Sequence, residues 1–377
     1  GGAVEFNELD AGSYTVDVEA TLSGALSGVG SAEVAVTEGE TASCSVLMNR
    51  VYTAAQAAER IAERISDDNG ENWNIIVAGP IDDDGLLEIA KNLKDVLTEG
   101  CISLDLGRTT GLSSIGVTKF QNCTALSAIV LPEGIGSIYE NAFDGCTSLA
   151  SVTISDTVNE IGQLAFRNCS ALKSIEIPNS VTTIAIGAFR DCTALTSIEI
   201  PRGVITIGSD SFNGCTALES IEIPDSVTTI ERAAFHGCSS LTDVYIPDSV
   251  TEIGNQTFTK CSNLKSIVLS AGITSIAEQV FRECTALTSI EIPDGVSEIK
   301  SSAFMSCEVL ESITIPVSVT SIETGAFVSC NKLKGGTVKY KGLSDDWNGI
   351  AIGSNNPPFE SGSGIKIICS DNKTITL

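Results

Sequence analysis

Histidine and basic residues are scarce in this sequence. His236 is the single histidine among 377 residues, and 22 lysines and arginines stand against 48 aspartates and glutamates, for a formal net charge of -26. Proteins that bind nucleic acid neutralise its phosphates with lysine and arginine, and anionic membrane surfaces attract the same residues. The charge balance therefore argues against nucleic acid and against an anionic membrane surface as partners.

Long apolar runs are missing as well. A helix that crosses a bilayer needs roughly 18 consecutive apolar residues, and no segment of the chain approaches this length. We therefore expect no membrane insertion. The chain begins Gly1-Gly2 without a methionine, which is typical of a mature or trimmed protein, so the lack of an export signal says nothing about localisation.

What the sequence holds instead is a repeat of fixed length. Phenylalanine recurs every 23 residues without an insertion, and a cysteine follows each one three residues later, from Cys123 to Cys330. A fixed period of this length predicts a solenoid, in which each unit is one coil and like residues stack on like residues. We assign the solenoid to residues 111–334. The repeated phenylalanines are Phe120, Phe143, Phe166, Phe189, Phe212, Phe235, Phe258, Phe281, Phe304 and Phe327.

The cysteines of the repeat fall at one position beside a phenylalanine, where a small apolar side chain fills the interior. We therefore predict a row of reduced, buried thiols. Metal binding is disfavoured, because ligands spaced one per coil form a row and not a tetrahedron. Cys44, Cys101 and Cys369 lie outside the row and are not assigned a state.

One unit, residues 284–306, shows how a coil is built. The alternation over 290–292 (Ile-Glu-Ile) predicts a short strand with two inward residues and one outward residue. Pro293 ends the strand because it has no N–H to donate. Val296 and Ile299 then predict a second extended segment that also faces inward.

Three motifs recur together over nine units: Leu-x-x-Ile-x-Ile-Pro, Val-x-x-Ile and Ala-Phe-x-x-Cys. In this combination, over residues 101–377, the chain resembles the leucine-rich repeats of the BspA-like family of bacterial surface proteins. Segments 112–116 and 347–350, which flank the repeats, resemble flanking segments of the same family. The resemblance implies a right-handed solenoid, an adhesive role, an extracellular or cell-surface location on a bacterium, and no catalytic residues.

The apolar core of a solenoid must be covered at both ends. Residues 51–110 alternate helical and extended patterns, which predicts a parallel α/β cap that starts the sheet. The predicted elements are a helix over 53–66, a strand over 74–78, a second helix from Asp82 to Gly100, and a strand over 102–106. Asp82, Asp83 and Asp84 are interpreted as the start of the second helix, because a calcium loop needs acids at alternate positions.

The two ends of the chain lie outside these units. Residues 335–377 are predicted to form a C-terminal cap, with strands at 338–340 and 365–368 and with Trp347 and Phe359 over the last core layer. Residues 1–50 show alternating apolar residues between glycine-rich turns. They resemble the closing strands of small surface β-sandwiches and predict a truncated, all-β segment of four strands.

An enzyme needs reactive groups that converge, and few are present. Other units carry residues from arginine to valine at the repeat position of His236. Such variety predicts a solvent-facing position, and we therefore expect His236 to have no functional role. No Ser–His–acid or Cys–His arrangement can be built around it, and no phosphate loop or dinucleotide fingerprint occurs. We expect no catalysis, no metal and no cofactor.

The outward residue of each first strand forms a row along the solenoid. Stacking makes Glu176, Glu199 and Glu222 neighbours, although like charges on adjacent strands destabilise each other. The row is either a charged face that keeps the sheet soluble or a recognition stripe for a basic partner, with Tyr245 as an aromatic anchor and Glu291 as a further acid. In chain order the row is Val130, Thr153, Glu176, Glu199, Glu222, Tyr245, Val268, Glu291 and Thr314.

The leading functional hypothesis is a non-catalytic, monomeric adhesin or protein-binding module that binds a host extracellular or matrix protein through this long face. One alternative is a structural spacer that displays the N-terminal segment away from the cell. A second alternative, a carbohydrate-active or carbohydrate-binding surface protein, is disfavoured because aromatic residues make up only 5% of the chain.

Overall fold

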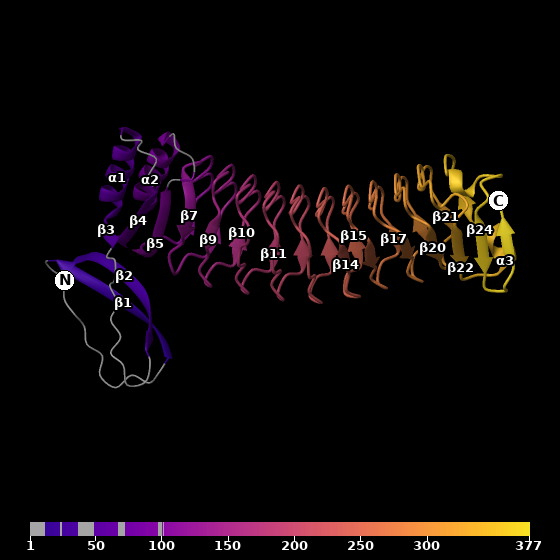
Figure 1. Ribbon diagram of the computed structural model, residues 1–377, viewed down its shortest axis with the longest axis horizontal. Helices are drawn as coiled ribbons and strands as arrows, with labels where there is room; N and C mark the ends of the chain where they lie inside the picture. The colour runs from indigo at the N-terminus through magenta and orange to yellow at the C-terminus, as the bar shows by residue number, and fades with distance from the viewer. Residues whose placement is uncertain (1–11, 23–24, 37–48, 67–71, 97–99, 101) are drawn as a thin grey trace.

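The computed structural model describes residues 12–22, 25–36, 49–66, 72–96, 100 and 102–377. The chain forms one long row of coils, with two helices at the N-terminal end of the row and a smaller cap at the C-terminal end (Figure 1). The predicted repeat solenoid with an α/β N-terminal cap is thus confirmed. The proposed division into 1–50, 51–110, 111–334 and 335–377 stays a prediction.

Most coils contribute one strand to each of two sides of the solenoid. On the first side, strands of successive coils pair in parallel, as in Val244 with Ile267. The strands of this side are β7 (Leu126–Val130), β9 (Ser151–Thr153), β14 (Asp243–Tyr245), β16 (Ser266–Val268), β18 (Ser289–Glu291), β20 (Ser312–Ile315), β22 (Thr337–Tyr340) and β24 (Lys366–Cys369).

The second side is built from strands of two residues. Ile184, Ile207 and Ile230 stack in register there, all buried, as the repeat predicted. The strands of this side are β6 (Ser114–Ile115), β8 (Ser137–Ile138), β10 (Glu160–Ile161), β11 (Thr183–Ile184), β12 (Thr206–Ile207), β13 (Thr229–Ile230), β15 (Glu252–Ile253), β17 (Ser275–Ile276), β19 (Glu298–Ile299), β21 (Ser321–Ile322) and β23 (Ala351–Ile352).

The repeated phenylalanines form a continuous stack inside the solenoid. All ten are fully buried. Neighbouring rings lie 5.1–5.9 Å apart at their centroids, with interplanar angles of 1–21°. At the C-terminal end Phe359 meets Phe327 edge-on, at 5.1 Å and 78°. The offset and edge geometries are the favourable ones for aromatic pairs, so the stack contributes to packing along its whole length.

A third ladder joins the coils beside this stack. The backbone N–H groups of Thr118, Phe120 and Asn122 donate to carbonyls of the next coil at 3.0, 2.8 and 2.7 Å, and the same pattern recurs down the row. The residues two before and two after each phenylalanine take a positive φ, as Thr118 (55°) and Asn122 (60°) do. Sequence reasoning missed this ladder, although the frequent Gly, Asn and Asp two residues after phenylalanine favour such a conformation.

One consequence of this ladder is close contact between left-handed residues of adjacent coils. A Cβ added at Gly145 would lie 2.2 Å from Oδ1 of Asn122, and one at Gly214 would lie 2.3 Å from Oδ1 of Asp191. The side chain of one coil therefore occupies the space that a side chain of the next coil would need.

The repeat cysteines are buried, unpaired thiols, as predicted. From Cys146 to Cys330, each Sγ donates to the backbone oxygen of the phenylalanine in the preceding coil, at 3.0–3.3 Å. Cys123, in the first coil, donates to the Ala90 oxygen at 3.6 Å. Cys369 is also buried, whereas Cys44 and Cys101 lie outside the described residues.

The N-terminal cap is a parallel sheet with two helices. Strands β3 (Asn49–Tyr52), β4 (Trp73–Pro80) and β5 (Ile102–Thr110) pair in parallel and continue into β7. Helix α1 (Ala54–Ser66) begins with a capping box, because the Gln56 N–H bonds Thr53 Oγ1 and the Thr53 N–H bonds Gln56 Oε1.

Helix α2 (Asp83–Asp95) begins as predicted and ends earlier than predicted. Asp82 caps it, accepting from the Gly85 N–H at 2.8 Å, which confirms the capping interpretation. The expected end at Gly100 is wrong: Val96 is already extended, with φ -73° and ψ 123°. Apolar periodicity at Val96 reflects burial against the sheet and not helical backbone.

A buried lysine joins this cap to the first coil. The side chain of Lys119 is 5% exposed, and its Nζ lies 2.7 Å from Asp83 Oδ1 and donates to the Asp83 backbone oxygen at 3.2 Å. A buried ammonium group needs such partners because desolvation is costly. The pair fixes helix α2 against the start of the repeat.

The C-terminal cap covers the last core layer with aromatic residues. Trp347 and Phe359 are 3% and 8% exposed and pack against each other; Trp347 also packs against Tyr340, and Phe359 against Phe327 of the last repeat, which confirms their predicted place. Strand β24 pairs in parallel with β22, and a final antiparallel strand lies beside it. The other elements of this cap are α3 (Ser344–Trp347), the 3-10 helix η1 (Pro357–Phe359) and β25 (Thr374–Thr376).

At the other end, strands β1 (Gly12–Leu22) and β2 (Ala25–Val36) form an antiparallel hairpin, and β2 pairs with β3. The described part of residues 1–50 thus extends the sheet of the cap. The origin of this segment as a truncated β-sandwich of four strands stays a prediction, since much of the segment lies outside the described residues.

Replacing Phe212 by alanine should weaken the middle of the solenoid. Phe→Ala in a core costs about 3–5 kcal/mol, and Phe212 stacks on Phe189 and Phe235 at 5.6 and 5.4 Å. Because coils couple only to their neighbours, unfolding should divide into stages. Hydrogen exchange should quicken first in the coils around residue 212, with Phe120→Ala as a control that shifts the effect towards the N-terminal cap. Faster exchange at the N-terminal end in both variants would contradict this prediction.

The thiol row should be inert in the folded protein. Burial raises the pKa of Cys215 and Cys261 to about 12, and only the thiolate reacts readily. At a pH of about 8, a thiol reagent should leave Cys123 to Cys330 unlabelled in the native protein and should label all of them in denaturant. Peptide mapping that finds native labelling, or disulfides among these residues, would show that the row is not interior.

Candidate binding surface

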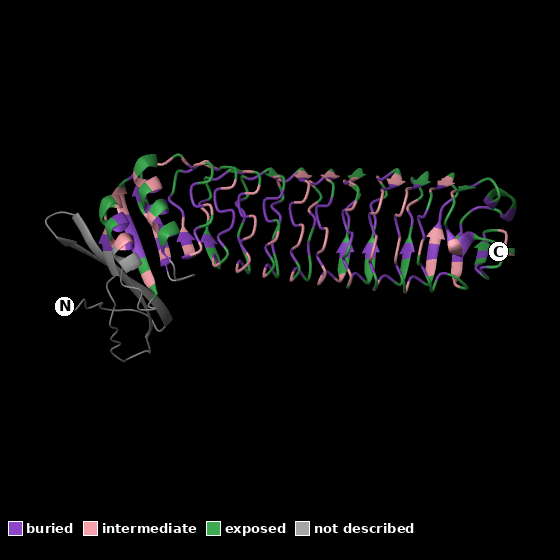
Figure 2. Cartoon of the chain, turned by 90° about the horizontal axis from the view of Figure 1, so that it is seen from above, coloured by how far each residue is buried: buried purple, intermediate pink, exposed green. Residues whose placement is uncertain are grey.

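The strand face is the outward row of the first side, from Val130 to Thr314, and the structure places it as predicted. Glu199 is exposed, whereas its neighbours Ile198 and Ile200 are 8% and 3% exposed. This alternation of buried and exposed residues continues along the coils (Figure 2). The predicted site residues Glu176, Glu199, Glu222, Tyr245 and Glu291 are all exposed on this face.

Glu176, Glu199 and Glu222 form an acidic stripe over three consecutive coils. Among the described residues, none of these three carboxylates takes part in an ion pair. The stripe therefore presents three uncompensated negative charges to solvent, spaced by roughly 4.8 Å if the coils follow the spacing of paired strands.

The strand ladder loosens where the acidic stripe lies. We expected a strand in every coil, but in the fully described stretch between β9 and β14 the first side holds only an isolated bridge, Glu199 with Glu222. Nearby hydrogen bonds are also longer: 3.3 Å from the Glu219 N–H to the Thr196 oxygen, against 2.8 Å from Lys265 to Thr242. The bridge that remains joins two of the acids, and a 3.3 Å bond also links the coils of Glu222 and Tyr245, from the Thr242 N–H to the Glu219 oxygen, so repulsion between like charges does not account for this difference.

Two apolar side chains follow the stripe. Tyr245 and Val268 pair in register on β14 and β16, and they are 58% and 56% exposed. Sequence reasoning identified Tyr245 but gave Val268 no role. Its signal was visible, because valine stands at a position where most coils carry a polar residue. Together the two residues form an apolar pair on the strand face, between Glu222 and Glu291.

Glu291 differs from the three acids of the stripe. The structure separates it from them by the apolar pair and pairs it with Lys341, whose Nζ lies 3.0 Å from Glu291 and 2.7 Å from Asp294. Hydrogen bonds to Asp294 and then to Glu291 raise the pKa of Lys341 above its usual range. A cation from a later part of the chain thus shares the strand face with the acids.

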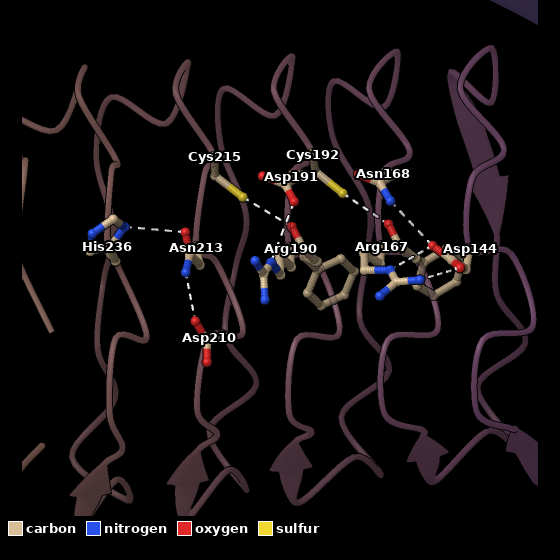
Figure 3. A network of polar contacts seen from close by, with 12 residues as sticks. Asp144, Arg167, Asn168, Arg190, Asp191, Cys192, Asp210, Asn213, Cys215 and His236 are labelled. Carbon is tan, nitrogen blue, oxygen red and sulfur yellow. Dashed lines mark hydrogen bonds and ion pairs between the residues drawn. The ribbon is translucent and has the colours of Figure 1, made fainter. Parts of the chain in front are cut away.

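The side that carries the phenylalanines holds a separate polar network (Figure 3). Asp144 is 3% exposed. It accepts two hydrogen bonds from Arg167, at 2.8 and 2.6 Å, and one from Gln121 at 3.0 Å. Burial by itself raises the pKa of the Asp144 carboxyl, but the bonds from Arg167 and Gln121 outweigh it, and the pKa lies below its usual range.

These residues share the repeat position of His236, so the prediction that this position faces solvent is wrong. Asp144 and Thr259 are buried there, at 3% and 4%, and His236 is partly buried, with Nδ1 3.3 Å from Asn213 Oδ1. Burial lowers the pKa of His236, with Lys260 as a further cause. Residue types vary at this position because side chains there pair with particular residues of adjacent coils. A comparison of the repeats cannot distinguish such pairing from solvent exposure.

A serine, a lysine and an aspartate also meet in the C-terminal cap. Ser344 Oγ donates to Asp371 Oδ2 at 2.9 Å and accepts from Lys373 Nζ at 3.2 Å. The hydrogen bond to Asp371 raises the pKa of Lys373. The arrangement ties α3 to the turn between β24 and β25.

The described residues also show no cluster of three or more His, Cys, Asp or Glu side chains placed to hold a metal ion. In the same part of the chain, no helix combines the length and apolarity that a membrane crossing requires.

Stacked 23-residue coils, a buried Phe–Cys interior and one exposed strand face define the protein as a leucine-rich repeat solenoid. Residues 113–242 and 205–334 both match the family described as "BspA type Leucine rich repeat region (6 copies)". The chain belongs to this family, as its repeat motifs indicated.

Solved structures similar to the chain include three bacterial proteins. A leucine rich cell surface protein from Faecalibacterium prausnitzii is 26% identical (89% of this chain, 97% of that chain, TM-score 0.42). Leucine-rich repeat proteins from Bacteroides ovatus and Eubacterium ventriosum are 23% identical (80% and 92%, TM-score 0.39) and 20% identical (93% and 95%, TM-score 0.45). No curated protein matches the chain.

The Asp144–Arg167 pair should stabilise the fold in a pH-dependent way. Asp144→Asn should lower stability at neutral pH by about 1–2 kcal/mol, since hydrogen bonds to charged groups are lost. The pKa of Asp144 is lowered in the folded state, so its contribution is present above the ordinary value of about 3.9 and is lost as the pH falls further. Thermal unfolding followed by circular dichroism should show the two proteins converging below a pH of about 4. A difference that persists at low pH would mean that the variant acts through packing.

Proposed function

We propose that this chain is a non-catalytic protein-binding module at the surface of a bacterium, and that it contacts a host extracellular or matrix protein through the strand face. Membership in the BspA-type family supports a protein-binding or adhesive role. The observation that carries the proposal is the acidic stripe: three exposed, unpaired carboxylates beside the exposed ring of Tyr245.

Physical chemistry indicates the kind of partner that this surface suits. Unpaired acids on a chain of net charge -26 attract a basic surface from a distance, and electrostatic attraction acts mainly on the rate of association. Tyr245 supplies apolar area with a hydroxyl group, a combination enriched where interfaces gain most of their binding energy. The partner should therefore present lysine or arginine beside an apolar or aromatic group.

The spacer hypothesis has its own supporting observation, because the coils form one extended row with the β1–β2 hairpin at one end (Figure 1). A spacer would need no particular side chains on the strand face. The carbohydrate hypothesis has less support: of the aromatic residues whose side chains are described, only Tyr139 and Tyr245 are markedly exposed, at 40% and 58%, and they belong to different repeat positions.

Replacing Glu176, Glu199 and Glu222 together by glutamine should slow association with the partner. Binding of the full chain to a panel of purified extracellular-matrix proteins would be measured by surface plasmon resonance from low to high salt. The variant should associate more slowly and show a weaker salt dependence, because exposed charges are screened over about 8 Å at physiological salt. Stability should stay equal or rise slightly, since repulsion within the strand ladder is relieved.

The matched control changes the same charge elsewhere on the solenoid. Glu252, Glu298 and Glu308 are exposed and lie outside the strand face, so their replacement by glutamine should leave association nearly unchanged. Equal rates for the wild type and the stripe variant at every salt concentration would show that the stripe serves solubility. If neither variant nor wild type binds any matrix protein, the spacer hypothesis gains support.

A further inference from the structure

We propose that the strand face also binds a second copy of itself, with two chains packed face to face and antiparallel about a two-fold axis between the coils of Tyr245 and Val268. In a two-fold interface the same patch serves both copies, so the patch must be complementary to itself. The order of residues along the strand face meets this condition.

The centre of the proposed interface is apolar. Tyr245 and Val268 lie side by side on adjacent coils and are each more than half exposed. An antiparallel copy centred between them places the tyrosine of one chain over the valine of the other, twice. Apolar and aromatic residues at the centre with charged residues towards the rim is the usual composition of a protein interface.

The acidic stripe lies on one side of this centre, and an exposed lysine lies on the other side. Glu176 stands three coils before Tyr245. Lys339, which is exposed on β22 and continues the row one coil beyond Thr314, stands three coils after Val268. Among the described residues neither side chain forms an ion pair. A two-fold axis at the centre therefore brings Glu176 of one copy opposite Lys339 of the other copy.

The packing brings one pair of like charges together near the centre, and Lys341 reduces the repulsion between them. Two-fold packing places Glu222 opposite Glu291 of the second copy, but Glu291 already carries the Nζ of Lys341 at 3.0 Å. Glu222 of one copy thus faces the Glu291–Lys341 ion pair of the other copy and not an unpaired carboxylate. A parallel arrangement would instead align the acidic stripes of the two copies, and like charges brought together cost energy.

The shape and size of the face set the strength of the dimer. The row of coils is nearly straight in both views (Figures 1 and 2), so two copies can touch along it. From Glu176 to Lys339 are seven coil steps, or roughly 34 Å at 4.8 Å per step. A contact along a single row of this length buries little surface, and small interfaces are typical of transient complexes. We therefore expect a weak dimer whose affinity rises at low salt.

Charge exchange at the two ends of the face tests this proposal. Sedimentation velocity on the purified full-length chain would measure the dissociation constant over a concentration series at two salt concentrations. Glu176→Lys and Lys339→Glu should each weaken the dimer about tenfold, since each pair occurs twice in the dimer. The double variant should recover an affinity close to that of the wild type, because the pair is then reversed.

Two further variants complete the experiment. Tyr245→Ser should abolish the dimer, whereas Glu308→Lys, an equal charge change outside the strand face, should leave it intact; circular dichroism checks that all variants fold. A wild type that stays monomeric at every concentration, as the sequence led us to expect, would overturn the proposal. A double variant as weak as the single ones would also overturn it. Because no other protein is present, the result is independent of whether a matrix protein binds.

Discussion

Every coil of this protein depends on its neighbours for the hydrogen bonds of its own backbone. Thr118 donates to Glu140 in the next coil, whereas Thr228 donates to Ile205 in the preceding one. A coil taken alone would leave these groups without partners, at a cost comparable to each lost bond. The requirement explains why both ends carry caps: the parallel strands of the N-terminal cap start the first sheet, and an antiparallel strand, β25, ends it.

The same dependence separates positions that packing fixes from positions that can carry function. Inward residues must stack on like residues, so phenylalanine, cysteine and isoleucine recur at their positions with little freedom. Outward residues need not stack on like residues, and at the outward position three consecutive coils carry a carboxylate. These three carboxylates are exposed, so the packing of the core does not require them.

The fixed period made most of the fold predictable from sequence, because a residue type held at one position through ten units has one environment. The burial of Phe212 and Cys215 and the exposure of Glu199 followed from this. Features that depend on two particular neighbours were not predictable. The network around Asp144 exists because Arg167 stands one coil later, and the interruption of the strand ladder between β9 and β14 has no counterpart in the repeat motif. A comparison of the coils position by position treats each residue separately and does not show such pairs. For this reason the predicted environment of His236 was wrong.

Contacts between residues of positive φ in adjacent coils differ from place to place along the solenoid, although the coils share one motif. The amide of Asn122 fills the space beside Gly145, and the carboxylate of Asp191 fills the space beside Gly214. Exchanging the coil that contains Gly145 for one with Lys260 at the same position would require the amide of Asn122 to move. Elsewhere consecutive coils carry side chains at this position, as Asn168 and Asp191 do. When a coil is copied to a new place, the side chains beside Gly145 and Gly214 must therefore adjust to the new neighbour, whereas a copied pair of coils keeps the contact it already has.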